Sequence, residues 1–329
     1  MQSNMVNISA LFQACGIKTE DVYILETEGM YPYKQVVEEN WAYYTAKALQ
    51  RLKFLLDKEG KKIETAGIVG ICSGVEGIAL ARVFQETLKS MIVTDIDEEI
   101  LQGTLQNLKA ATQGVTILPK VGLFCEPIQK TNIFVDLVHA NIPNLPTSGG
   151  EDLSKGDEKG SFAPPNYYEK YNPKEQFIHF ALPAQYAYLQ SAKKIIKEGG
   201  TIIAEIGGRM PFEILEDLFA ACDLEMQELV VGFKKQTEAR INFSGYHKNE
   251  LEYGVCFEYY LYEESMSFLK EKGFQNPDFQ FSTIQIKKWL EPYKISAGEA
   301  LRLYEEKGII AGHIVQLLRG IKNKEKNET

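Results

Sequence analysis

The spacing of hydrophobic residues predicts a helix near the N-terminus. In the stretch EENWAYYTAKALQRLKFLLDKEG, hydrophobic side chains recur at intervals of roughly three to four positions, at Trp41, Tyr44, Leu49, Leu52 and Leu56. This period places them on one side of an α-helix, which can then be buried against the rest of the protein.

From about residue 66, short apolar runs alternate with helical patterns. The predicted strands are AGIVGI, SMIVTDID, VTILPK, NIFVDLVHA and TIIAEIGG. The predicted helices among them include GIALARVFQETL, EEILQGTLQNLKAAT and MPFEILEDLFAACD. EMQELVVGFKKQ and YGVCFEYYLYEE are expected to close the sheet as an antiparallel pair. Alternation at these lengths is typical of an α/β fold with a doubly wound, mostly parallel sheet, here of seven strands.

The pattern divides the chain into three parts. Residues 1–60 are expected to form an N-terminal helical segment that covers the substrate, and residues 61–262 the main domain. Within this domain, TSGGEDLSKGDEKGSFAPPN (147–166) is rich in Gly, Ser and charge and is predicted to be a mobile insertion. Residues 263–329 are expected to form a helical extension.

Composition narrows the function classes. The chain has 329 residues, a net charge of −9 and a pI near 5.2, which argues against nucleic acid as a partner. The five cysteines are scattered without a CxxC pair, so neither a metal site nor a disulfide framework is expected. No signal peptide or membrane span is indicated, and we expect a cytoplasmic protein that acts on a small molecule. A homo-oligomer is compatible with the sequence.

The stretch HANIPNLP follows the predicted strand NIFVDLVHA directly. Because proline has no N–H to donate, Pro143 and Pro146 cannot lie within a central strand. Two interpretations remain: a plain loop, or a rigid turn that holds Asn141 at the carboxyl end of a strand to contact a ligand.

A glycine-containing loop, GICSGVEG, lies between the first predicted strand and the helix after it. Gly70, Gly74 and Gly77 allow a close approach of the backbone to a ligand and leave the first N–H groups of the helix free. Cys72 stands where a dinucleotide fingerprint needs glycine. The spacing therefore suits a ligand without a pyrophosphate, such as S-adenosylmethionine (SAM), although a turn without a ligand is the alternative.

The second predicted strand ends in an acidic pair. Asp95 lies 21 residues after Gly74, where a carboxylate can accept hydrogen bonds from ribose hydroxyls. Asp97 is predicted to cap the next helix, with Glu98 and Glu99 at its positive end. An acid at this place is common to folds that bind nicotinamide nucleotides and folds that bind SAM.

These motifs resemble the class I SAM-dependent methyltransferases, with a Rossmann-like fold over residues 66–260. NIPN resembles the Asn-Pro-Pro-Tyr box of amino-methyltransferases, including the release-factor glutamine methyltransferases. The order of ANIPNLP, a Tyr-rich helix and a strand ending in IGGR is similar to the methyltransferase domain of plant methionine S-methyltransferases over about 20–225. Asn144 stands where the box usually has an aromatic residue.

The resemblance implies SAM-dependent transfer of a methyl group to a small amino acid, most specifically to the sulfur of methionine, giving S-methylmethionine. It implies contacts with SAM from a set of residues at the strand ends: Gly70, Cys72, Ser73, Gly74, Asp95, Ile96 and Asn141. Asn141 and Tyr31 are the expected catalytic residues. The acceptor is expected to contact another set: Glu28, Tyr33, Pro143, Tyr168 and Arg209.

The chemistry assigns roles to some of these residues. A thioether has no proton to remove, so no general base is needed, and aromatic faces can stabilise the cationic product. Arg209 is the candidate for gripping a carboxylate, with a surface charge as the alternative. Glu205, late in a buried strand, needs a partner such as a ligand's amino group. Cys72 is interpreted as a small side chain that fills a tight turn rather than as a catalytic residue.

Three alternatives to a methionine S-methyltransferase stay open from the sequence. One is N-methylation of a protein glutamine, another is a SAM-binding protein without activity, and the third is a nicotinamide-dependent dehydrogenase.

Overall fold

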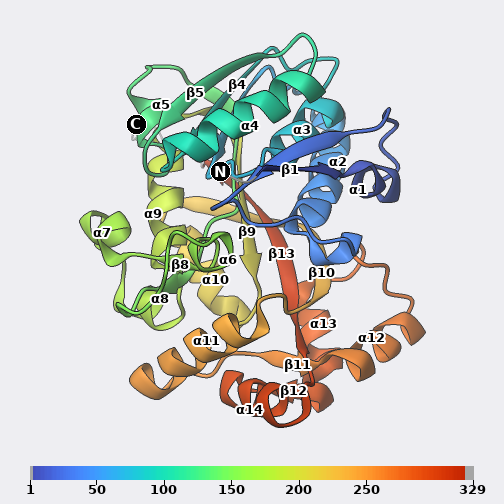
Figure 1. The fold of residues 1–329 in the computed structure, drawn as a ribbon, viewed down its shortest axis with the longest axis vertical. Helices are drawn as coiled ribbons and strands as arrows, with labels where there is room; N and C mark the ends of the chain where they lie inside the picture. Colours follow the sequence, from blue (N-terminus) through green and yellow to red (C-terminus); the bar gives the residue numbers. More distant parts are fainter. Residues whose placement is uncertain (1–2, 323–329) are drawn as a thin grey trace, which may run out of the picture.

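A computed structural model describes residues 3–322, and its centre is one nine-stranded sheet (Figure 1). From one edge to the other, eight strands follow in the order β12 (Lys294–Ile295), β11 (Tyr259–Leu261), β13 (Ala311–Lys322), β9 (Ile196–Gly207), β6 (Val135–Ala140), β3 (Thr65–Val69), β4 (Ser90–Asp95) and β5 (Thr116–Val121). The ninth, β10 (Leu224–Lys235), pairs with β13.

The doubly wound, mostly parallel sheet that the sequence predicts is confirmed. β5, β4, β3, β6 and β9 are parallel, whereas β13 runs antiparallel to both β9 and β10. Six of these seven strands were predicted from the sequence, whereas β13 was not, and β11 and β12 extend the sheet. The chain leaves β3 in one direction to β4 and β5 and then returns to β6 on the other side. Ligands bind in open α/β sheets at the carboxyl ends of the strands beside such a reversal.

Helices cover both faces of the sheet because alternate strand residues point to opposite sides. On β3, Ile68 belongs to the hydrophobic core beneath α2 (Trp41–Glu59) and α3 (Val75–Val83). Val69 belongs to the core on the other face, which includes residues of α5 (Glu126–Gln129), α9 (Pro183–Ala192) and α10 (Phe212–Ala220). The predicted helix over 41–59 is present, with Leu49, Leu52 and Leu56 buried. α4 (Glu98–Ala111) follows β4.

The N-terminal segment is only partly helical, which corrects our expectation for residues 1–60. β1 (Ser3–Asn7) and β2 (Tyr23–Thr27) form an antiparallel pair around α1 (Ser9–Ala14), and η1 (Val37–Glu39) precedes α2. The side chain of Asn107 on α4 bonds both the N–H and the C=O of Leu25, at 2.7 and 2.9 Å. This attachment fixes where the chain after β2 passes over the sheet.

Short elements lie in and beside the segment that we predict to be a mobile insertion. β7 (Leu145–Pro146) pairs in parallel with β8 (Phe162–Ala163), and α6 (Gly156–Lys159) lies between them in sequence. α6 packs closely on the N-terminal segment, because a Cβ at Gly156 would lie 2.0 Å from the carbonyl oxygen of Met30. α7 (Pro165–Tyr168), η2 (Glu169–Tyr171) and α8 (Glu175–His179) then lead to α9.

The closing strand pair is not the one we predicted. β10 pairs with β13, whereas the stretch 253–264 contributes only the short β11 and borders α11 (Ala239–Tyr253). β13 is buried from Ala311 to Gly320, and a strand buried on both faces lacks the polar alternation that marks a strand in sequence. The expected helical extension therefore holds α12 (Tyr262–Glu271), α13 (Thr283–Leu290), η3 (Glu291–Tyr293) and α14 (Ala297–Lys307), followed by a central strand.

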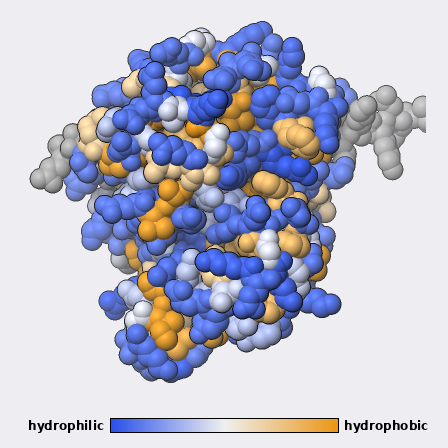
Figure 2. Space-filling view, turned by 90° about the vertical axis from the view of Figure 1, so that its right-hand side faces the viewer, coloured by the Kyte–Doolittle hydropathy of each residue, from blue (hydrophilic) through white to orange (hydrophobic). Residues whose placement is uncertain are grey.

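Within residues 3–322, no helix combines the length and hydrophobicity that crossing a bilayer requires. On the face seen in Figure 2, hydrophilic side chains dominate and hydrophobic ones gather in small, separate patches.

Candidate functional site

A cavity of about 680 Å³ lies at the carboxyl ends of the parallel strands, where the order of the sheet reverses. Residues that follow β3, β4, β5 and β6, together with the end of β9, form its floor. Three segments from outside the parallel strands form its walls and cover, around Tyr31, around Lys159 and around Thr237. Its size lies within the range typical of small-molecule sites.

The glycine loop turns sharply between β3 and α3. Gly70, Cys72 and Gly74 have φ angles of 65°, 49° and 88°, a region that favours glycine. Gly70, Cys72 and Ser73 line the cavity. Gly74 instead precedes α3 and packs on α4, where a Cβ would lie 3.1 Å from Thr104 Cγ2. Its glycine is needed for the turn, and the expected contact of Gly74 with a cofactor is not supported.

Cys72 is held on three sides. Its N–H donates to Asp95 Oδ2 at 3.2 Å, its Sγ accepts the N–H of Tyr31 at 3.3 Å, and its carbonyl accepts the hydroxyl of Thr104. Burial raises the pKa of the thiol to about 12. The thiol is therefore protonated at neutral pH and joins the N-terminal segment to the loop.

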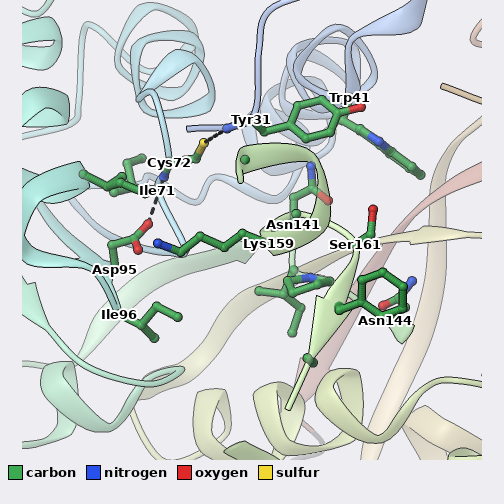
Figure 3. A pocket seen from close by; sticks show the side chains of 18 of the residues that line it. Tyr31, Trp41, Ile71, Cys72, Asp95, Ile96, Asn141, Asn144, Lys159 and Ser161 are labelled. Atoms are coloured by element: carbon green, nitrogen blue, oxygen red, sulfur yellow. Dashed lines mark hydrogen bonds between the residues drawn. The ribbon is translucent and has the colours of Figure 1, made fainter. Parts of the chain in front are cut away.

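The two aspartates after β4 have different surroundings, and only the predicted capping role of Asp97 is confirmed. Asp97 caps α4, accepting the N–H groups of Glu99 and Ile100 at 3.0 and 3.3 Å. Asp95 is 7% exposed and lines the cavity, and its oxygens accept the N–H groups of Cys72 and Asp97. Burial raises the pKa of Asp95 above its usual value. Figure 3 shows Asp95 and Cys72 on one side of the cavity, with Ile96 beside Asp95.

The NIPN box follows β6 directly, and Asn141, Pro143 and Asn144 line the cavity. Asn141 Nδ2 donates to Glu76 Oε1 at 3.1 Å. Because a carboxylate only accepts, this bond turns the amide so that Oδ1 remains available to a ligand. Asn144 Oδ1 accepts from Gln185 Nε2 at 3.1 Å, which holds the other end of the box.

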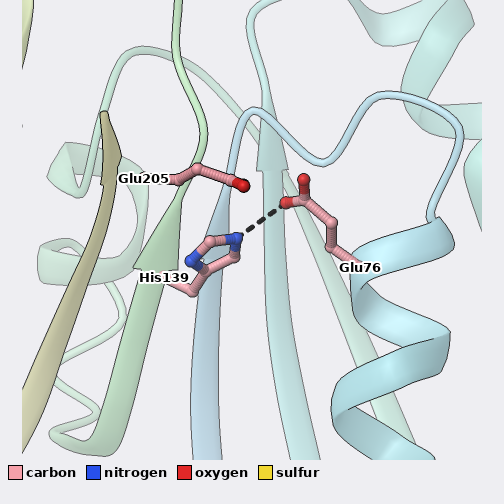
Figure 4. A group of neighbouring side chains, drawn as sticks. All are labelled: Glu76, His139 and Glu205. Carbon is pink, nitrogen blue, oxygen red and sulfur yellow. Dashed lines mark hydrogen bonds and ion pairs between the residues drawn. The ribbon is translucent and has the colours of Figure 1, made fainter. Parts of the chain in front are cut away.

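The side chains of Glu76, His139 and Glu205 converge (Figure 4), and Glu76 is the partner of Asn141. One ligand atom from each lies within 4.8 Å of the other two. His139 Nε2 bonds Glu76 Oε2 at 2.7 Å, and Glu205 Oε2 accepts the hydroxyl of Thr45 at 2.6 Å. Burial, and then the charge of Glu76, raise the pKa of Glu205 well above its usual value.

Arg209 lines the cavity although it is only 2% exposed. Its guanidinium bonds Gln236 Oε1 at 2.7 Å, His313 Nε2 at 2.9 Å and Tyr246 Oη at 3.3 Å. Burial lowers the pKa of His313 well below its usual value, so all three partners are neutral. Arg209 is therefore a buried cation at a cavity wall, and the alternative of a surface charge is wrong.

Two tyrosines of the N-terminal segment are placed where they can contact an acceptor. Tyr31 and Tyr33 line the cavity. The Tyr31 hydroxyl donates to the carboxylate of Glu238, and burial raises its pKa well above the usual value. Lys34 Nζ lies 5.0 Å from the centre of the Tyr31 ring and pairs with Glu238 at 2.6 Å.

Two of the predicted acceptor contacts lie elsewhere. Glu28 is exposed and does not line this cavity. Tyr168 is 4% exposed and borders a separate cavity near α11. Both residues were predicted because they lie near a motif in the sequence. The turn after β2 directs the Glu28 side chain away from the cavity, and α7 does the same for Tyr168. Tyr188 is a core residue whose hydroxyl donates to the carbonyl of Ile203 at 2.8 Å.

Glu76 and Lys159 line the cavity but were not predicted as site residues from the sequence. Glu76 lies in the first turn of α3, two positions after Gly74, so its place after the glycine loop was an available signal. Lys159 Nζ lies 2.5 Å from Asp97 Oδ2, which ties α6 to the start of α4 across the cavity. Nothing local marked it, because it lies in a stretch whose composition indicated mobility.

Comparisons with known proteins add only the fold. No protein-family profile matches the sequence, and no curated protein matches it. The chain is similar to a putative RNA methyltransferase from Pyrococcus horikoshii, with a TM-score of 0.43 and 11% identity over 96% of this chain and 98% of that chain. It is also similar to a 16S rRNA N2 G1207 methyltransferase from T. thermophilus, solved with AdoMet and guanosine, with a TM-score of 0.43 and 14% identity over 70% and 48% of the two chains.

A third similar structure is a precorrin 8w decarboxylase from Methanobacterium thermoautotrophicum, with a TM-score of 0.38 and 12% identity over 91% of this chain and 97% of that chain. These values describe a distant likeness in fold. The chemistry of the site therefore rests on the residues of this chain.

Proposed function

We propose that this protein transfers the methyl group of SAM to the sulfur of free methionine, giving S-methylmethionine and S-adenosylhomocysteine. One observation carries the proposal: the glycine loop and Asp95 line the same single cavity as Arg209 and the Asn141 box. The first set suits a nucleoside and the second an amino acid.

The residues near the glycine loop fit SAM. Each oxygen of Asp95 accepts one backbone N–H, so each can accept a further bond, as two ribose hydroxyls require. Ile96 and Phe124 offer apolar surface to a flat ring at the same end of the cavity. When bound, SAM supplies an electrophilic methyl group on a sulfonium centre.

The residues around Arg209 and Asn141 favour an anionic acceptor whose nucleophilic atom has no proton to lose. Arg209 is a buried cation with neutral partners, so a ligand carboxylate can supply the missing charge. Tyr31 and Cys72 are poor general bases, because both have raised pKa values and both are already hydrogen-bonded. A thioether needs no base, and the remaining tasks are alignment and exclusion of water. Asn141 Oδ1 can stabilise the cation that forms on the acceptor.

These features favour methionine over a glutamine within a protein, because a peptide-bound side chain brings no carboxylate to Arg209. They also suit an enzyme better than a SAM-binding protein without activity, since the acceptor end of the cavity would then have no role.

The test is an assay of the purified protein with SAM and L-methionine. We expect equal amounts of S-adenosylhomocysteine, measured by chromatography, and S-methylmethionine, measured by mass spectrometry. Reactions without methionine, and with Asp95→Asn, serve as controls and should give little of either product. Binding of SAM without formation of either product would overturn the proposal.

A further inference from the structure

The cluster of Glu76, His139 and Glu205 brings two carboxylates together, and among the described residues no Lys or Arg side chain bonds either of them, although the charge of Lys234 acts to lower the pKa of Glu205. Its side chains come from α3, β6 and β9, and they converge on one point below the cavity (Figure 4). Glu76 and Glu205 line the cavity, while His139 lies behind them and is 1% exposed. A ligand in the cavity can therefore reach both carboxylates.

Glu205 is the residue that points to a ligand. It is 2% exposed, and its Oε1 has no hydrogen-bond partner among the described residues, whereas Oε2 accepts from Thr45. A buried carboxylate oxygen without a partner is costly, and folded proteins rarely keep one without a reason. Since burial and the charge of Glu76 raise the pKa of Glu205, a cation placed between the two carboxylates would bind the ionised form strongly.

The geometry decides between a metal ion and an ammonium group. Two ligands of one tetrahedral metal ion, each about 2.1 Å from it, lie roughly 3.4 Å apart. His139 Nε2 and Glu76 Oε2 lie closer, at 2.7 Å, as donor and acceptor of a hydrogen bond. The Nε2 proton occupies the lone pair that a metal would need. An ammonium nitrogen about 2.8 Å from two oxygens holds them roughly 4.6 Å apart, which is compatible with a cluster whose ligand atoms all lie within 4.8 Å of one another.

Arg209 lies at a suitable distance for the other half of an amino acid. Residues 205 and 207 point to the same face of β9, and the Arg209 guanidinium lies over Gly207, 1.9 Å from where a Cβ would be. Two residues of a strand span roughly 7 Å. The ammonium and carboxylate of an α-amino acid, with a hydrogen bond of about 2.8 Å at each end, span a similar distance.

We propose that Glu205 and Glu76 form a binding site for the α-ammonium group of a free amino acid, while Arg209 binds its carboxylate. The inference rests on the proposed function for the identity of the acceptor and extends it to the class of substrate. The site recognises a zwitterion, so a residue within a peptide is excluded, because its nitrogen is a neutral amide. His139 is a positioning residue, since its bond holds Glu76 Oε2 and directs the carboxylate.

The test measures binding separately from methyl transfer. In the presence of saturating S-adenosylhomocysteine, isothermal titration calorimetry compares L-methionine, N-acetyl-L-methionine and L-methioninamide. The proteins are the wild type, Glu205→Gln and Arg209→Gln, with Glu228→Gln as the matched control. Glu228 is a half-buried carboxylate on β10 that accepts the N–H of Thr283 and lies outside the cavity. Thermal melts and binding of S-adenosylhomocysteine show whether each variant is folded.

We expect the wild type and Glu228→Gln to bind methionine and to reject both analogues. Glu205→Gln should bind methionine roughly 10- to 100-fold more weakly and lose only the discrimination against the N-acetyl compound. Arg209→Gln should lose only the discrimination against the amide. This crossed pattern assigns each end of the amino acid to its own residue, which general damage to the site would not do.

Three results would overturn the inference. The first is wild-type binding of N-acetylmethionine as tight as that of methionine, and the second is unchanged binding in Glu205→Gln. The third is stoichiometric binding of ZnCl2 or MnCl2 that Glu205→Gln abolishes, which would assign the cluster to a metal. Methionine that binds in the crossed pattern without being methylated would instead refute the proposed function and leave the ammonium site standing. If neither methionine, homocysteine nor glutamine binds, the site is not one for amino acids.

Discussion

Gly207→Ala should separate recognition of the acceptor from binding of the cofactor. A Cβ at this position would lie 1.9 Å from Arg209 Nη1 and 2.8 Å from Cζ, whereas real Cβ atoms essentially never approach another heavy atom within 3.0 Å. The guanidinium must therefore move by at least about 1.1 Å, judged from the difference between these distances. The φ angle of Gly207 is not positive, so the alanine backbone itself is not strained.

The displacement has a calculable cost. It displaces Nη1 from Tyr246 Oη and, because the guanidinium moves as one plane, strains the bonds of Nη2 to Gln236 and His313. The group that we assign to the acceptor carboxylate is thereby misplaced. Loss of one charge-assisted bond costs about 1.5–3 kcal/mol, which corresponds to a roughly 10- to 150-fold rise in KM for methionine. Because β6 and β3 separate β9 from β4, the strand that ends at Asp95, the Kd for S-adenosylhomocysteine should stay within about twofold.

The assay is steady-state kinetics with methionine as the varied substrate, together with calorimetry for S-adenosylhomocysteine. Gly150→Ala is the control, since a Cβ there would meet nothing within 4 Å and its φ is not positive. A Gly207→Ala enzyme with the KM of the wild type would refute the role of Arg209, because the steric conflict leaves the guanidinium no way to stay in place.

Three further predictions concern other parts of the cavity. Asp95→Asn should weaken the binding of S-adenosylhomocysteine by roughly 10- to 100-fold in calorimetry. Asp97→Ala should instead cost the helix cap, about 1 kcal/mol of stability in urea unfolding, together with the partly exposed pair with Lys159, and change the Kd for S-adenosylhomocysteine by no more than a few-fold. Lys159→Met removes the 2.5 Å ion pair with Asp97. Because this pair is partly exposed, the Kd for S-adenosylhomocysteine should rise by only a few-fold. Glu205 should give a pH dependence: kcat/KM for methionine should rise with pH as this carboxyl ionises beside Glu76, His139, Thr45 and Lys234. A wild-type profile that is flat at every pH above 4.5, the usual value for a glutamate, would contradict the assignment. Because the pKa of Glu205 is raised in the folded protein, this group contributes its full stability at pH values below the unfolded pKa of about 4.3. The contribution is lost as the pH rises and the carboxyl ionises, so Glu205→Gln should raise Tm more at pH 8 than at pH 5.

The parts of this structure that the sequence predicted depend on local patterns. Strands such as β3 and β6 follow from short apolar runs, and the role of Asp97 follows from its place before a helix. The ends of parallel strands meet at one edge of a sheet, so Asp95 and Asn141 could be expected near one another without knowledge of the packing.

The parts that were missed depend on contacts between distant segments. β13 enters the middle of the sheet after four helical elements, and no local signal gives its partners. The convergence of Glu76, His139 and Glu205 depends on the register of β6 against β9 and on how α3 crosses the sheet. The cover of the cavity depends on α6 packing against Met30, which composition alone described as a mobile segment.

The burial of Glu205 and Arg209 is itself an argument for a ligand between them. Both are nearly inaccessible charged groups near the carboxyl end of β9, and each is satisfied only in part and by neutral partners. If their purpose were stability, the two could pair with each other, or apolar residues could replace them at a gain. Gly207 instead leaves room for the guanidinium beside the strand and keeps it apart from the carboxylate. A group that carries a positive charge at one end and a negative charge at the other satisfies both residues at once, and the free α-amino acid is the simplest such ligand.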